Sequence, residues 1–228
     1  MRRATEMARQ KHEMATLMSE CFRYHGGMNF LAHLLLAGDD DGLRLGAMLG
    51  DFVRGKKVLE SFSDDVRLGI ELHRHIDQYT DALPDIANLR RHFPAPFRRY
   101  SGIVIDLAYD HELAKRWDQY SNESLQSFDR NVRELLARHE SLLPDRLSRF
   151  MSYADRRGLF AAYRKESEIL RSLHGIGTRL SRPNPLHRID DIWDGLAPYF
   201  SASFEGVFLQ IQSDVAAWLK SRSTTNGS

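Results

Sequence analysis

The stretch SDDVRLGIELHRHIDQYTD, residues Ser63 to Asp81, decides the fold class of this chain. It opens with one serine and two aspartates, which are typical of a helix N-terminus. Apolar residues then recur three and four positions apart, and this spacing predicts one long amphipathic helix rather than a strand.

The same helical spacing recurs on both sides of this stretch, whereas alternating runs of β-branched residues are absent. The sequence therefore predicts an all-α fold, a single-domain multi-helix bundle. The other segments expected to be helical include 28–37, 41–49, 97–118, 121–138 and a final helix that starts at Pro198.

Length and composition describe an ordinary globular protein. The 228 residues are 42% hydrophobic and 28% charged, enough for one domain with a sizeable core. Lys and Arg number 32 against 31 Asp and Glu, so overall charge does not point to nucleic acid, although local basic patches remain open. The longest apolar runs are too short for a membrane span. The single cysteine, Cys21, excludes an intrachain disulfide framework and favours the reducing cytoplasm.

Domain limits follow from the same pattern. Residues 1–27 carry no continuous apolar run and end at Gly26-Gly27, so we interpret them as a flexible N-terminal extension. The alternative is a helix packed on the domain. The helical domain is expected over 28–220, followed by a polar tail, 221–228.

Two polar residues interrupt the apolar stripe of the 63–81 helix. His73 and Asp77 are four positions apart and share one face with Val66 and Ile70. His75 points nearly opposite His73 and is expected in solvent.

A second helix has the same feature. Asp110, with His111 beside it, falls among apolar residues such as Ile103 and Leu107. A buried, unpaired carboxylate costs several kcal/mol, so it takes a proton or a cation. The Asp and His sets of two helices suggest a shared divalent ion, and these donors suit Mn, Fe or Zn better than Ca. The competing interpretation is salt bridges from the carboxylates to Arg54, Arg74 or Arg90.

Two further candidates are weak when each is taken alone. Asp51, in the break between Gly50 and Gly55, could cap a helix, and His33 could be a satisfied core histidine. Arg54 with Lys56 and Lys57 could bind phosphate oxygens, or the three could form a solvated basic loop.

Four ordered motifs give the chain a family resemblance. They are Met28-Asn29-Phe30-Leu31-Ala32-His33-Leu34, Gly50 to Gly55, His73 to Asp81, and Asp106 to His111 with Trp117. In order and spacing they resemble the bacterial acyl carrier protein phosphodiesterases, with a weaker similarity through Arg179 to Arg182.

That family is a divergent relative of the HD-type metal phosphohydrolases, so the resemblance implies an HD-phosphohydrolase-like helical fold and a divalent metal, typically Mn(II). The implied reaction is hydrolysis of holo-acyl carrier protein to the apo form and 4'-phosphopantetheine. Asp51 matches a functionally important aspartate of the family motif. The metal ligands implied with it are His33, His73, Asp77, Asp110 and His111. Arg54 and Arg74 are expected to neutralise charge on the phosphoryl group.

Three other functions stay open at this point. The same residues would serve an HD-type phosphohydrolase that acts on a nucleotide or another small phosphodiester. A helical module that only binds acyl carrier protein is the non-catalytic alternative. A di-iron protein is disfavoured, because such bundles use Glu with Glu-xx-His pairs.

Overall fold

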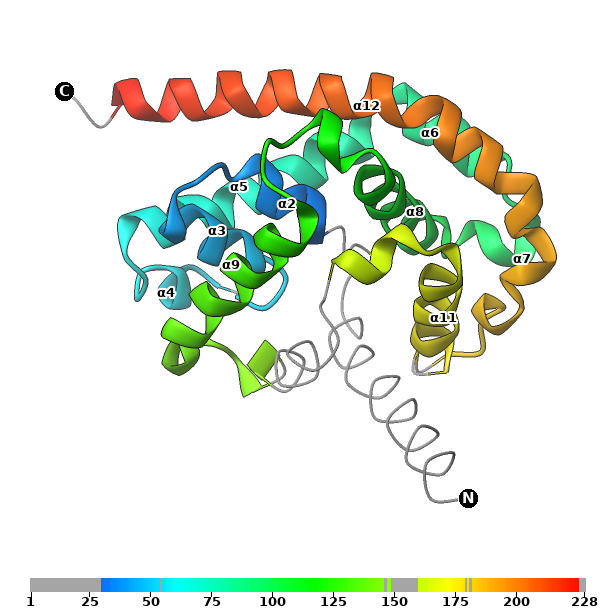
Figure 1. Ribbon diagram of the computed structural model, residues 1–228, viewed down its shortest axis with the longest axis horizontal. Helices are drawn as coiled ribbons and strands as arrows, with labels where there is room; N and C mark the ends of the chain where they lie inside the picture. Colours follow the sequence, from blue (N-terminus) through cyan, green and yellow to red (C-terminus); the bar gives the residue numbers. More distant parts are fainter. Residues whose placement is uncertain are drawn as a thin grey trace. The chain divides into compact units, whose positions relative to one another are not determined.

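The computed structural model describes residues 30–53, 55–145, 147–148, 160–178, 180 and 182–225 (Figure 1). These residues form ten α-helices and several short 3-10 turns and contain no β-strand, which confirms the all-α prediction. Residues 1–27, expected to be a flexible extension, lie outside the described part. None of the described helices is both long and apolar enough to cross a membrane.

The described chain divides into two compact units. One comprises residues 30–92 and 198 onward, and the other comprises residues 93–197. The long helix α12 (Asp190–Thr225) contributes its first turns to the second of these units and the remainder to the first.

The unit that carries His33 and His73 is built from six helices. They are α2 (Phe30–Leu36), α3 (Asp41–Leu49), α4 (Lys56–Leu59), α5 (Asp64–Ala82), α6 (Pro84–Arg91) and α12 from Pro198 onward. The long stretch that opened the sequence analysis is α5, and its start and end match the prediction within one residue. Asp40 caps α3 by accepting a hydrogen bond from the Leu43 amide at 2.8 Å.

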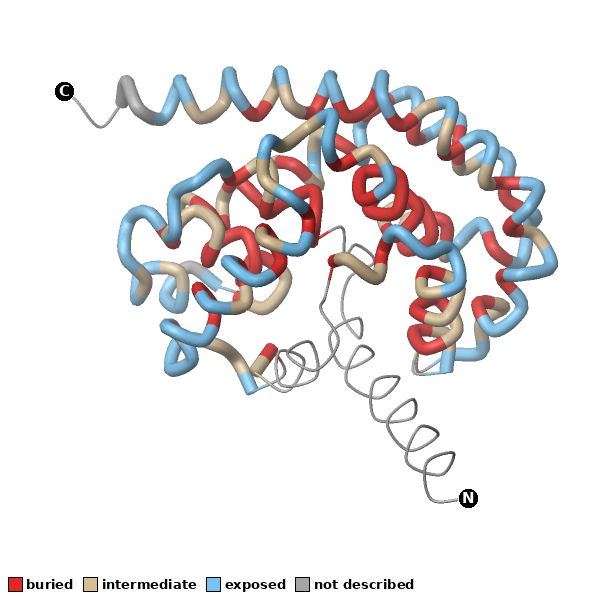
Figure 2. The backbone as a smooth tube through the Cα atoms, in the orientation of Figure 1, coloured by how far each residue is buried: buried red, intermediate tan, exposed pale blue. Residues whose placement is uncertain are grey.

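The final helix differs from its prediction at the N-terminus. It begins at Asp190, eight residues before Pro198, so Pro198 lies inside the helix instead of starting it. Phe204, Phe208 and Val215 are all buried and lie on the apolar face of this helix. Figure 2 shows this face as buried segments that alternate with exposed ones along α12.

The other unit contains α7 (Ala95–Arg98), α8 (Ser101–Lys115), α9 (Leu125–Arg138) and α11 (Glu166–Gly177), with short 3-10 turns at 117–119, 140–142, 161–164 and 186–188. The helix predicted over 97–118 is therefore divided, since α7 ends at Arg98 and α8 begins at Ser101. Aromatic rings form its core: Trp117 contacts Phe128 at 4.8 Å between centroids, and Phe128 contacts Phe160 at 6.3 Å. Helix α8 is buried along most of its length.

Candidate metal centre

The centre of the first unit is a pair of stacked histidines on α2 and α5. His33 and His73 are only 1% and 2% exposed, and their rings stack at 3.9 Å between centroids. The prediction that His73 faces the core is confirmed. Residues four apart lie on one side of a helix, so Asp77 joins His73 at the same place.

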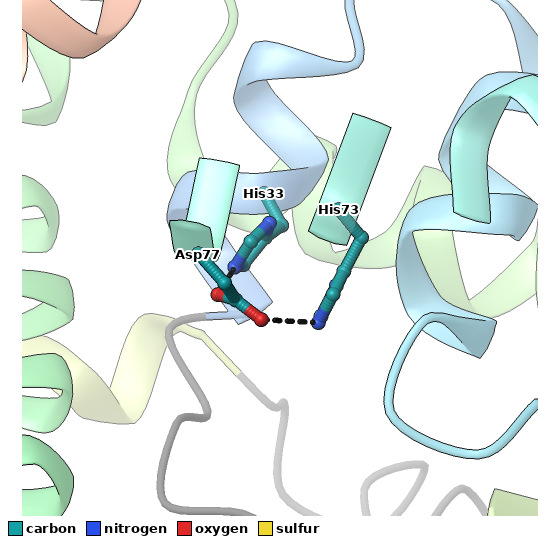
Figure 3. A group of neighbouring side chains, drawn as sticks. All are labelled: His33, His73 and Asp77. Carbon is teal, nitrogen blue, oxygen red and sulfur yellow. Dashed lines mark hydrogen bonds and ion pairs between the residues drawn. The ribbon is translucent and has the colours of Figure 1, made fainter. Parts of the chain in front are cut away.

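Asp77 bridges the two rings (Figure 3). Its Oδ1 lies 3.1 Å from His33 Nε2, and its Oδ2 lies 3.3 Å from His73 Nε2. Ligand atoms of all three residues lie within 4.8 Å of one another, a spacing that one metal ion can span. The competing interpretation, an arginine salt bridge to Asp77, does not hold for Arg74 or Arg90, because these donate to the Val53 carbonyl and to Asp81.

Asp51 reaches the same imidazole from a turn that follows α3. Its Oδ1 lies 3.4 Å from His73 Nε2, and its side chain is 13% exposed. The amides of Phe52 and Val53 both donate to the Leu49 carbonyl, at 2.9 and 3.0 Å, so the turn continues the end of α3. The side chain of Val53, at the end of this turn, is buried in the core.

Close packing of α3 on α5 depends on glycines that the sequence analysis missed. A Cβ on Gly46 would lie 2.2 Å from the Val66 carbonyl oxygen, and one on Gly69 would lie 2.3 Å from the Leu43 oxygen. A Cβ on Gly50 would lie 2.2 Å from Cγ of His73. The spacing of Gly42, Gly46 and Gly50, one every four residues, is the signal that could have predicted this contact face.

The orientation of the His73 ring is set by a carbonyl in the last turn of α3. His73 Nδ1 donates to the Ala47 oxygen at 2.8 Å, an oxygen that helix geometry leaves without an intrahelical partner. In a neutral ring this bond places the proton on Nδ1, so the lone pair of Nε2 points toward Asp51 and Asp77. Metal-bound histidines use this arrangement.

The charges of the cluster shift one another's pKa values. Burial alone would lower the pKa of His73, but attraction by Asp51 and then by Asp77 outweighs it and raises the pKa to about 10. Burial would raise the pKa of Asp77, but the two imidazoles hold it well below its usual range. The pKa of His33 is lowered, by burial and then by repulsion from His73. With His33 neutral, the positive charge of His73 and the negative charge of Asp77 attract each other within the cluster.

The donor set fits a divalent cation. His73 Nε2 and Asp51 Oδ2 are buried, and neither has a hydrogen-bond partner among the described residues, whereas His33 faces Asp77 with its paired nitrogen, Nε2. The contacts from His73 Nε2 to the two carboxylates are long and poorly directed for hydrogen bonds, so they are charge attractions. Buried polar atoms left in this state are costly, and a cation among them would relieve that cost. Imidazole with carboxylate is a donor set for first-row transition metals.

Asp110 and His111, the other predicted ligands, lie on α8 in the second unit. Asp110 is completely buried, which confirms the prediction that it lies in a core stripe. His111 Nδ1 donates to the Tyr163 carbonyl at 2.6 Å, so its neutral tautomer also presents Nε2 as an acceptor. Their part in a shared metal site stays a prediction.

The predicted arginines and His75 have different outcomes. Arg54 lies outside the described residues. Arg74 is exposed, and its Nη2 donates to the Val53 carbonyl at 2.8 Å in a partly buried hydrogen bond. The prediction that His75 lies in solvent is wrong: its side chain is 25% exposed, its Nε2 contacts Asp214 at 2.5 Å, and its ring stacks on Trp218. The sequence analysis missed this because Asp214 is distant in sequence and reaches α5 only when α12 packs against it.

The similarity of this chain to known proteins identifies its family. A family model described as "Acyl carrier protein phosphodiesterase" matches residues 28–211, a range that includes the whole candidate centre. The chain belongs to the acyl carrier protein phosphodiesterase family. Membership in this family makes it a phosphodiester hydrolase.

Curated relatives named "Acyl carrier protein phosphodiesterase" come from Escherichia coli O157:H7 and from Escherichia coli strain K12/DH10B. Each is 37% identical over 179 residues, which cover 77% of this chain and 89% of the relative. No solved structure matches this chain. The family resemblance inferred from the four motifs is thus confirmed.

Proposed function

We propose that this protein is a metal-dependent phosphodiesterase that hydrolyses holo-acyl carrier protein to apo-acyl carrier protein and 4'-phosphopantetheine. One observation carries the metal dependence: the buried ligand atoms His73 Nε2 and Asp51 Oδ2 lack hydrogen-bond partners beside the carboxylate of Asp77, which bridges His33 and His73. The relatives named for acyl carrier protein support the substrate.

Four residues of the first unit would hold the ion: His33, Asp51, His73 and Asp77. We propose Mn(II), which accepts both imidazole and carboxylate ligands, and Asp110 and His111 as further ligands. A divalent ion held there supplies Lewis-acid activation of water and of a phosphate oxygen near neutral pH.

The side chains would perform the remaining work. The Ala47 carbonyl keeps the His73 proton on Nδ1, so Nε2 stays available as a ligand. Arg54 would neutralise charge that develops on a non-bridging phosphate oxygen. Water adds to phosphorus, the bond from phosphorus to the seryl oxygen of the carrier breaks, and that oxygen leaves with a proton. The products are a carrier protein with a free serine and 4'-phosphopantetheine.

The substrate also suggests a surface and a compartment. Acyl carrier proteins are acidic, so a basic face is needed to dock them. The predicted sources of this face are Arg90-Arg91, Arg98-Arg99 and the stretch from Arg179 to Arg188. Arg90 and Arg188 form ion pairs with Asp81 and Asp191, so these two charges are less available for docking. We propose a cytoplasmic location, consistent with the single cysteine.

A direct experiment tests this function. Purified protein is incubated with holo-acyl carrier protein and Mn(II), and the carrier is weighed by mass spectrometry. We expect loss of the phosphopantetheine mass that stops with EDTA and returns with Mn(II). Asp77→Asn should abolish it, whereas Asp81→Asn, an exposed aspartate on the same helix, should not.

Two outcomes would contradict the proposal. A carrier whose mass never changes, with or without metal, removes the assigned substrate. If cleavage of a nucleotide or another small phosphodiester replaces it, the alternative HD-type phosphohydrolase function is favoured. Cleavage that survives both EDTA and Asp77→Asn removes the metal site instead.

A further inference from the structure

The turn that carries Asp51 touches α5 on both sides of the aspartate. On one side, Gly50 lies so close to His73 that a Cβ there would be 2.2 Å from the ring. On the other side, the Val53 carbonyl accepts the 2.8 Å hydrogen bond from Arg74. His73 and Arg74 are consecutive residues of α5. The two contacts therefore hold the turn beside the His73 imidazole, which Asp51 faces.

Of these two contacts, the hydrogen bond from Arg74 is the more directional, and a substitution of the arginine side chain removes it. A guanidinium donor makes a charge-assisted hydrogen bond, which is stronger than one between neutral groups. Within the turn, the amides of Phe52 and Val53 already pair with the Leu49 carbonyl. These bonds fix the shape of the turn, but they do not attach it to α5. The contacts of Gly50 with His73 and of Arg74 with the Val53 carbonyl provide that attachment.

Resting on the proposed metal site, we infer that Arg74 is a positioning residue: by holding the Val53 carbonyl, it keeps the Asp51 carboxylate against His73. Arg74 then acts through Asp51 and does not contact the phosphoryl group. The sequence analysis had expected that direct contact. The distinction matters chemically, because a positioning arginine affects metal binding, whereas a phosphate-contacting arginine affects substrate binding.

The first test needs no metal. Arg74→Met is compared with Arg67→Met, which removes a partly exposed arginine of the same helix that pairs with Asp64 and not with the turn. Hydrogen exchange is followed by mass spectrometry in the full-length, EDTA-treated protein. We expect the amides of Phe52 and Val53 to exchange about tenfold faster or more in Arg74→Met, with exchange in α5 and melting temperature close to those of Arg67→Met. Unchanged exchange at these amides overturns the inference even if the protein binds no metal.

The second test uses Mn(II) itself as the probe. In titrations followed by electron paramagnetic resonance, Arg74→Met should weaken Mn(II) binding by about tenfold or more, as loss of outer support for a ligand does elsewhere. The double variant Asp51→Asn/Arg74→Met should bind no more weakly than Asp51→Asn alone. Independent, additive losses overturn the inference.

Kinetics separate the two roles of the arginine. At one fixed Mn(II) concentration below saturation, a positioning Arg74 leaves KM for holo-acyl carrier protein near the wild-type value and lowers kcat, because less of the variant enzyme holds metal. A raised KM with unchanged Mn(II) affinity would assign Arg74 to the substrate and overturn the inference. Failure of the proposed function looks different, because wild-type protein would then show no Mn(II)-dependent cleavage while the exchange result still stands.

Discussion

Replacing Gly50 by alanine should destabilise the protein because the added Cβ atom would clash with His73. The backbone of Gly50 is helical, with φ −49° and ψ −44°, so alanine meets no conformational penalty there. Its Cβ, however, would lie 2.2, 2.4 and 2.6 Å from three atoms of His73. Ordinary contact between carbon atoms is about 3.5–4.0 Å, so the ring or the turn must move by more than about 1 Å.

His73 has little freedom to make that movement. Its ring is buried, stacked on His33 and hydrogen-bonded to the Ala47 carbonyl. Overpacking of this kind costs about 1–3 kcal/mol, which for a chain of this size lowers the melting temperature by about 2–12 °C. Because Asp51 is the next residue, Mn(II) binding should weaken as well, by about tenfold or more.

The control for this variant is another glycine-to-alanine change. Gly206 lies on the exposed side of α12, where a Cβ would meet no atom within 4 Å. Gly206→Ala should therefore stabilise the protein by about 0.5–1 kcal/mol, since glycine is unfavourable inside a helix. Urea unfolding and Mn(II) titration of both variants provide the comparison. If Gly50→Ala matches wild type in stability and metal affinity, the close packing of the turn on His73 is refuted.

Three other predictions concern the same unit. Gly69→Ala should cost about 3 kcal/mol or more in urea unfolding, because its Cβ would meet the Leu43 carbonyl at 2.3 Å and a backbone atom cannot rotate away; a cost as small as that of an exposed glycine would contradict it. The raised pKa of His73, about 10, makes metal-free protein most stable below about pH 6.5 as far as this group is concerned, and that contribution is lost as pH rises toward 10; urea unfolding in EDTA should show this loss and His73→Gln should remove it, so identical pH profiles would be inconsistent with the cationic ring. His75→Ala should lower stability by about 1 kcal/mol through loss of its Asp214 bond without changing Mn(II) affinity, and a parallel fall in metal affinity would place His75 at the metal site instead.

Much of the helical framework follows from local rules that sequence alone contains. The start of α3 is set by the Asp40 cap, whose carboxylate accepts from a free amide of the first turn. Helix α5 begins after Ser63 with two aspartates, whose negative charge favours a helix N-terminus. The helical period predicts that His73 and Asp77 share one core-facing side of α5. They do lie beside each other, but only His73 is buried, whereas the Asp77 side chain is 43% exposed, so its prediction as a core residue is wrong. The same periodicity placed Asp110 correctly in a core stripe of α8.

The predictions from sequence were wrong where a tertiary contact outweighed a local preference. Proline is common in the first turn of a helix, which led to Pro198 as the start of the last helix. Burial of Trp193 and Leu196 instead favours extension of α12 back to Asp190. His75 was expected in solvent because a helix viewed alone has a polar side, yet α12 packs there and supplies Asp214.

The sequence by itself determined the fold class, the long helix and the pairing of His73 with Asp77, because each depends on residues within a few turns of one another. Only the tertiary structure decided that His33 stacks on His73, that Asp51 faces the same nitrogen, and that Arg74 holds the intervening turn. These contacts join segments that are separated along the chain, and glycines allow the close approach of α3 to α5 that brings the Asp51 turn to His73. Individual residues supply the ligand atoms of the centre, but the packing of the helices brings these atoms together.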